Sequence, residues 1–165
     1  MSGAQVLTVA ITAGSGLMAA VAGLLWAAHV YKRQTNAQIL LECSKRYDDI
    51  VAACPPEAWV GRLDPNHPPP ENPLTTQAVL RYLNLRDLEL YLWRQRYFSE
   101  GIWDVWGRML ANTLKGALLR REWPRLRQDF VSDPQFTSLV DDLQSPAGIW
   151  THRRLTWWQR LKGTT

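Results

Sequence analysis

The longest uncharged stretch of the chain, residues 6–31, constrains its fold more than any other feature. It runs for 26 residues without Asp, Glu, Lys or Arg. A helix of about 20 apolar residues crosses the hydrocarbon core of a bilayer, so this stretch is long enough to span one with some tilt. A cleaved signal peptide is the main alternative, but no basic residue precedes the stretch, and the apolar part of a signal peptide has only ~7–15 residues. The sequence therefore predicts a transmembrane anchor over residues 1–31.

The basic residues nearest this anchor predict its orientation. None precedes it, whereas four follow it closely: Lys32, Arg33, Lys45 and Arg46. Lys and Arg are enriched in the flanks that stay in the cytoplasm. We therefore expect a single-pass protein of the cell membrane, with its N-terminus outside and its main domain in the cytoplasm.

Small residues recur along the predicted anchor at four-residue spacing, in two overlapping sets. They are Gly16, Ala19, Ala20, Gly23 and Ala27. Such a face lets a second helix approach closely. These residues are the transmembrane packing candidates, and a homo-oligomer formed through this helix is left open.

The segment after the anchor is predicted to be helical until two prolines end it. Apolar residues recur at helical spacing between residues 39 and 54, which predicts a juxtamembrane helix over residues 32–54 that ends before Pro55 and Pro56. Seven of the ten prolines then fall between residues 55 and 73. Residues 55–74 are therefore predicted to be a Pro-rich linker that is neither helix nor central strand.

The two cysteines, Cys43 and Cys54, are predicted to be small apolar residues on one face of the juxtamembrane helix. A disulfide is not expected between them, because the cytoplasm keeps thiols reduced. Neither has the histidine neighbours of a metal or nucleophile site. The sequence thus predicts no metal and no cofactor.

Residues 75–145 are predicted to form a small domain of four helices. Thr75 or Thr76 is expected to cap a central first helix, Ser99 a second, and Ser132 or Asp133 a fourth. The third is expected to restart near Trp123, because Pro124 follows. The fold class is therefore all-α: anchor, juxtamembrane helix, linker and four-helix domain.

Apolar spacing also predicts which faces of these helices are buried. The second helix is expected to bury Ile102, Trp106, Met109, Leu110, Thr113 and Ala117. The third is expected to bury Leu119, Trp123, Leu126 and Phe130, and the fourth Phe136, Leu139, Val140 and Leu143. Trp106 and Trp123 are thus predicted core residues.

The net charge of +4 lies entirely in the C-terminal segment, residues 146–165, because residues 32–142 hold 15 basic and 15 acidic side chains. The body of the chain is neutral, so no nucleic-acid partner is expected. The segment is predicted to be a basic, Trp-rich amphipathic tail that lies on lipid headgroups or packs against protein. Its interaction candidates are Trp150, Arg153, Arg154, Trp157, Trp158 and Arg160.

Residues 81–143 also resemble a known family. Their pattern is R-x-x-N-x-x-x-x-E, a turn, I-W-x-x-W and a later Trp, at positions Arg81, Asn84, Glu89, Gly101, Ile102, Trp103, Trp106 and Trp123. This pattern is similar to that of the DUF4760-like family of uncharacterised, membrane-anchored bacterial helical proteins. The resemblance covers about two-fifths of the chain and implies a short anchor before a helical unit. It implies no reaction, and it does not extend to the tail.

Familiar catalytic signatures such as HExxH, CxxC, GxSxG and a Gly-rich phosphate loop are missing from the sequence. Polar residues such as Arg81, Asn84 and Glu89 are expected to be structural, with Glu89 reaching Arg86 or Trp93. We therefore expect no enzyme but a membrane-tethered helical module that presents a Trp-rich domain to a protein partner. An oligomerising membrane effector or channel component is the alternative.

Overall fold

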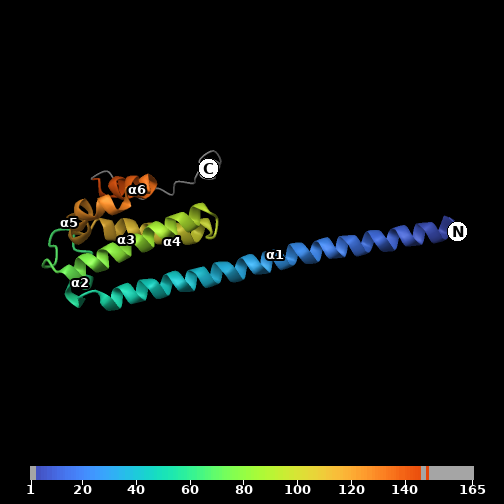
Figure 1. The fold of residues 1–165 in the computed structure, drawn as a ribbon, viewed down its shortest axis with the longest axis horizontal. Helices are drawn as coiled ribbons and strands as arrows, with labels where there is room; N and C mark the ends of the chain where they lie inside the picture. The colour runs from blue at the N-terminus through green and yellow to red at the C-terminus, as the bar shows by residue number, and fades with distance from the viewer. Residues whose placement is uncertain (1–2, 146–147, 149–165) are drawn as a thin grey trace. The chain divides into compact units, whose positions relative to one another are not determined.

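The computed structural model describes residues 3–145 and residue 148, with side chains from residue 18 onward except that of residue 19. Within these residues the chain forms six α-helices, one 3-10 helix and no strand (Figure 1). The predicted all-α class is confirmed. The chain divides into two compact units, Met1–Leu40 and Leu41–Thr165, which are described separately below.

Helix α1, Gly3–Ala53, is one unbroken helix of 51 residues (Figure 1). It contains the whole uncharged stretch and continues through the predicted juxtamembrane segment, ending just before the two prolines as expected. Among the residues that the structure describes with their side chains, which begin at residue 18, no helix is both long and apolar enough to cross a membrane. The anchor over residues 1–31 therefore stays a prediction.

The predicted linker contains a short helix that the proline count did not predict. Helix α2, Pro56–Gly61, begins with Pro56 in its first turn, followed by Glu57. Proline is tolerated there because the first turn of a helix needs no N–H donor. The prediction that residues 55–74 hold no helix is therefore wrong for these six residues. Ala58 is buried, and Trp59 packs against Tyr47 with 5.7 Å between the ring centroids, so the segment belongs to the folded unit.

Helix α3, Pro73–Arg94, is the central helix of the second unit, as predicted. It buries side chains on several sides, including Val79, Leu83 and Leu90. Its cap is Asn72, whose side chain accepts a hydrogen bond from the Leu74 amide at 2.9 Å. The prediction of a threonine cap is wrong, because Pro73 fits the first helical position and allows the helix to begin earlier.

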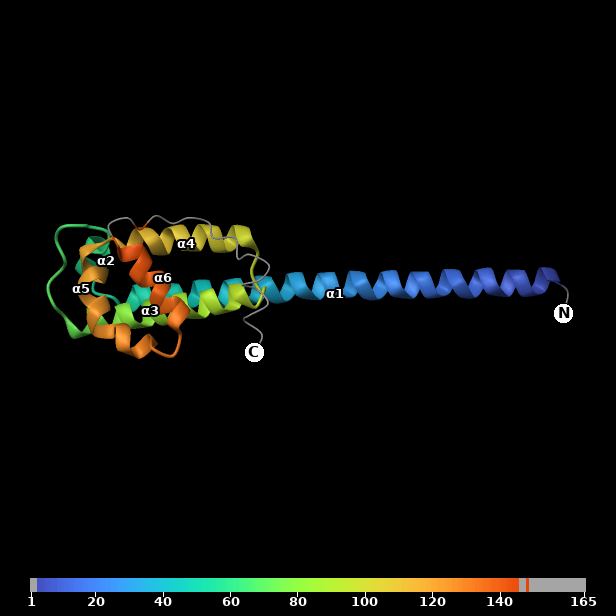
Figure 2. The ribbon, with the colours of Figure 1, turned by 90° about the horizontal axis from the view of Figure 1, so that it is seen from above.

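Helix α4, Glu100–Leu114, begins at the predicted Ser99 cap, which accepts from the Ile102 amide at 3.3 Å. It lies alongside α3 (Figure 2). Its buried face differs from the prediction: of the six expected residues only Leu110 is buried, and Ala117 lies in α5. The buried residues are Trp103, Gly107, Leu110, Ala111 and Leu114. Trp103 decides the orientation by stacking on Trp93 of α3, with centroids 4.9 Å apart.

Helix α5, Ala117–Leu126, passes into the 3-10 helix η1, Arg127–Phe130. The four apolar residues predicted for this segment are all buried: Leu119, Trp123, Leu126 and Phe130. The predicted restart near Trp123 is wrong, because Pro124 lies inside α5. Proline leaves the carbonyl four residues earlier without its donor, and that residue, Arg120, lies on the exposed side where water can reach it.

Helix α6, Pro134–Gln144, packs against α4 and η1 (Figure 2). Of the two predicted caps, Asp133 is the one used, since its carboxylate accepts from the amides of Gln135 at 2.9 Å and Phe136 at 3.0 Å. Phe136, Val140 and Leu143 are buried as expected, whereas Leu139 is half-buried. Phe136 meets Trp123 and Phe130 in an aromatic cluster that joins α6 to α5 and η1.

Candidate functional site

The most deeply buried ion pair of the described chain joins Arg86 and Glu89 of α3. The residues are three apart, and Nη1 of Arg86 lies 2.5 Å from Oε2 of Glu89. Their side chains are only 4% and 2% exposed. The predicted contact between Glu89 and Arg86 is therefore confirmed, whereas Arg81 and Asn84 are exposed and do not join it.

Two tyrosine rings enclose the guanidinium of this pair. The Cζ atom of Arg86 lies 4.8 Å from the ring centroid of Tyr82 and 5.4 Å from that of Tyr47 on α1. A desolvated cation over an aromatic face is stabilised by the negative face of the ring. The Nε of Arg86 is nevertheless buried without a hydrogen-bond partner. The pair therefore joins α1 to α3 through electrostatic contacts that water does not screen.

Burial also shifts the proton affinity of this cluster. It raises the pKa of Glu89 to about 7, although the charge of Arg86 opposes the shift. Protonated Glu89 therefore favours the folded state. This contribution is complete below the ordinary glutamate pKa of about 4.5 and is lost as the pH rises through about 7. Burial likewise raises the pKa of the Cys43 thiol to about 11, so Cys43 is a neutral, poorly nucleophilic thiol at neutral pH.

Asp87, next to this pair on α3, is a further carboxylate with a raised pKa. Burial and the nearby charge of Asp133 raise its pKa to about 6, and Arg94 opposes them. One of its carboxylate oxygens is buried without a hydrogen-bond partner. The protonated form of Asp87 also stabilises the folded state, and this contribution is lost at a lower pH than that of Glu89.

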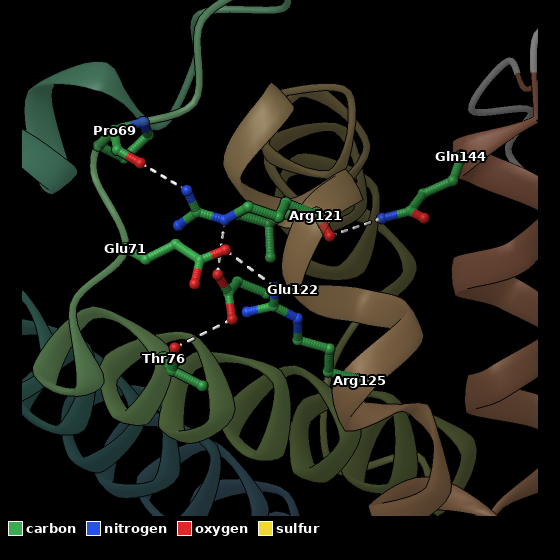
Figure 3. A network of polar contacts seen from close by, with 8 residues as sticks. Pro69, Glu71, Thr76, Arg121, Glu122, Arg125 and Gln144 are labelled. Atoms are coloured by element: carbon green, nitrogen blue, oxygen red, sulfur yellow. Dashed lines mark hydrogen bonds and ion pairs between the residues drawn. The ribbon is translucent and has the colours of Figure 1, made fainter.

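A second polar network lies around Glu122 of α5 (Figure 3). Glu122 is completely buried; one carboxylate oxygen accepts from the Thr76 hydroxyl at 3.0 Å and the other from Nε of Arg121 at 2.8 Å. Nη1 of Arg121 donates to the Pro69 carbonyl at 2.5 Å. The network therefore connects α3, α5 and the Pro-rich segment through one carboxylate.

Two further contacts fix the Pro-rich segment to α5, one at each end of the helix. Arg125 pairs with Glu71 at 2.9 Å (Figure 3), and the Ala117 amide donates to the Asp64 carbonyl at 2.8 Å. The Pro-rich segment and the residue before α5 lie so close together that a Cβ on Gly116 would be 1.9 Å from the Arg62 carbonyl oxygen. Residues 62–72 are thus part of the folded unit, which the prediction of a linker did not anticipate.

The predicted site residues fall into two groups, the tail residues and the packing candidates of the anchor. Trp150, Arg153, Arg154, Trp157, Trp158 and Arg160 lie outside the described residues. All five packing candidates lie in α1. The burial of Gly16 and Ala19 is not among the described features, whereas Ala20, Gly23 and Ala27 are exposed. Nothing lies within 4 Å of a Cβ placed on Gly23.

Sequence reasoning missed the network around Glu122. Its bonds join three segments, between residues 46 and 52 positions apart, and helical periodicity carries no information on such contacts. One indication was present: Glu122 is the only acid of α5 and lies among the apolar positions of its buried face.

Both networks connect helices to one another, which is a structural role. No group of three or more His, Cys, Asp or Glu side chains suited to a metal ion occurs among the described residues. No protein-family model, curated protein or solved structure matches the chain. The resemblance to the DUF4760-like family therefore stays a prediction.

Proposed function

We propose that this protein is a membrane-tethered helical module whose Trp-rich domain serves as an accessory or docking unit for a protein partner in the cytoplasm. One observation carries the proposal: the 26 uncharged residues lie within a single unbroken helix. At 1.5 Å per residue they extend about 39 Å, which exceeds the ~30 Å hydrocarbon core.

The exposed side chains of α1 support this proposal. Leu24 and Trp26 are 72% and 71% exposed, and Met18, Leu25 and Tyr31 are exposed as well. They point to different sides of the helix, so a single packed face would not cover them. A helix that is apolar all round is typical of a segment surrounded by lipid or buried within an assembly.

The most deeply buried carboxylates of the domain have structural partners. Glu89 and Glu122 are each bonded to an arginine and lie between helices, which leaves neither carboxylate directed at an open site. The cytoplasmic placement rests on the basic residues after residue 31. Membership of the DUF4760-like family is part of the same proposal.

Alkaline carbonate extraction of membranes tests the anchor. We expect the full-length protein in the membrane pellet and a chain that lacks residues 1–31 in the supernatant. A protein shortened at its N-terminus by cleavage would indicate a signal peptide instead. A full-length protein in the supernatant would refute the anchor.

Cross-linking in intact membranes tests the role of the domain. We expect adducts with a different protein that are lost when the domain alone is removed and the anchor is kept. Adducts that contain only this chain would favour the alternative, an oligomerising membrane effector or channel component.

A further inference from the structure

Helix α4 carries two apolar faces; one is buried, and the other is partly exposed. The buried face contains Trp103, Leu110 and Leu114. The other face, which we call the α4 stripe, is formed by Ile102, Val105, Trp106 and Met109. Val105 and Met109 are 48% and 45% exposed, while Ile102 and Trp106 are half-buried.

The spacing of the α4 stripe is that of a helix-binding surface. Its residues occupy positions i, i+3, i+4 and i+7, so they line one side of the helix for about 10 Å. The rest of the solvent side is polar, with Asp104, Arg108 and Asn112. An apolar row bordered by polar residues is the pattern by which a groove or helix receives an amphipathic segment.

The C-terminal segment of the same chain, residues 149–165, has the chemistry to cover this stripe. It holds Trp150, Leu155, Trp157, Trp158 and Leu161. Trp150 and Trp157 are seven residues apart, as are Ile102 and Met109, so a helical tail would present two indole rings at the spacing of the two ends of the stripe.

Charge favours the same occupant. Helices α4 and α6, which pack together, contain four acidic residues and one basic residue; of the acids, Asp104 pairs with Arg108 and Asp141 with Arg127 of η1. The tail contains four basic residues and no acidic one. Attraction between opposite net charges acts over about 8–10 Å at physiological salt, so it holds the tail near these helices without requiring a specific ion pair.

The place where the described chain ends puts the tail within reach. Gly148 donates its amide to the Ser145 carbonyl at 2.8 Å, and a Cβ there would lie 2.4 Å from the Asp142 carbonyl oxygen. The chain therefore turns tightly against the end of α6, which itself packs against α4. Seventeen residues then follow, enough to extend about 25 Å as a helix, compared with about 22 Å for the 15 residues of α4.

We propose that residues 149–165 dock on the α4 stripe of their own chain, with Trp150, Trp157 and Trp158 against Trp106 and Met109. A short tether gives the tail an effective concentration in the millimolar range, so weak contacts are enough to keep it bound. The tail then covers the α4 stripe, and any partner that binds the stripe has to displace the tail. This inference stands independently of the membrane anchor.

Site-specific photo-cross-linking of the full chain in mild detergent tests the contact. A benzoylphenylalanine placed at position 109 should form cross-links within one chain to peptides from residues 149–165. The same probe at Val131, an exposed apolar position on another part of the unit, is the control and should give none. Cross-links between two chains, or equal yields at both positions, would overturn the proposal.

Hydrogen exchange of the same protein gives a second measurement. Amides of residues 149–165 should exchange at least tenfold more slowly than an unstructured peptide, and the double variant V105D/M109D should remove that protection. The control variant V131D should leave it unchanged. Unprotected amides in the wild-type chain, protection that persists in V105D/M109D, or protection that appears only with anionic vesicles would each refute docking in cis.

Discussion

Replacing Glu122 with alanine should be among the most damaging single changes in the domain. Its carboxylate is completely buried and accepts hydrogen bonds from Thr76 and Arg121. The variant removes both acceptors and leaves the guanidinium of Arg121 facing a cavity. Arg121 already has one buried nitrogen, Nη2, without a partner.

The size of the loss follows from the burial of the two charges. Removing one partner of a buried ion pair costs about 3–5 kcal/mol, because the remaining charge is left unpaired. The side chain of Arg121 is 18% exposed, so some water can reach it. We therefore expect a loss near the lower limit, about 3 kcal/mol, which corresponds to a fall in Tm of roughly 10–20 °C for a domain of this size.

Thermal unfolding of the purified chain in mild detergent, followed by tryptophan fluorescence, measures this loss. The matched control is E71A, which breaks the exposed pair between Glu71 and Arg125 in the same network and should leave the Tm nearly unchanged. E122Q should fall between the two, since it keeps one acceptor oxygen but loses the charge. Equal Tm values for E122A and E71A would refute the argument that burial sets the energy.

Two other predictions concern the core. Because the pKa of Glu89 is raised to about 7, the wild-type domain should lose about 2 kcal/mol more stability than E89Q between pH 5 and pH 8 in urea titrations. Parallel curves for the two proteins would contradict the raised pKa. W123A should lower stability by ~3–5 kcal/mol, because Trp123 is buried and donates to Asp141, whereas W106A should cost clearly less, because Trp106 is half-exposed. Equal losses in the two tryptophan variants would show that the faces of α4 and α5 are assigned wrongly.

Local chemistry made most of the helix boundaries predictable. Two prolines end α1, Ser99 caps α4 and Asp133 caps α6, each through contacts within a few residues. The helix α2 and the earlier start of α3 were missed for the same local reason. In both cases a proline at the first helical position was interpreted as a helix breaker, although it fits there.

Contacts between distant segments were not predictable in this way. The bond between Arg121 and Pro69 joins residues 52 positions apart, and the close approach of Gly116 to Arg62 depends on the path of the loop. A single sequence shows that Glu122 is an acid among apolar residues, but not what it binds. Its buried position required a partner, and only the fold identifies it.

The mistaken face of α4 bears directly on the proposed docking of the tail. Apolar spacing selected the row that contains Ile102, Trp106 and Met109 because that row fits helical periodicity. The packing instead covers the adjacent row around Trp103, which stacks on Trp93. A helix in which both rows are apolar is expected where one row faces the core and the other receives a second segment. If the tail is that segment, V105D/M109D should release it while the Tm of the domain falls no more than in V131D, because Val105 and Met109 are exposed residues of the unit. A large loss of domain stability in V105D/M109D alone, with the tail unprotected already in the wild type, would mean that the stripe is simply part of the core.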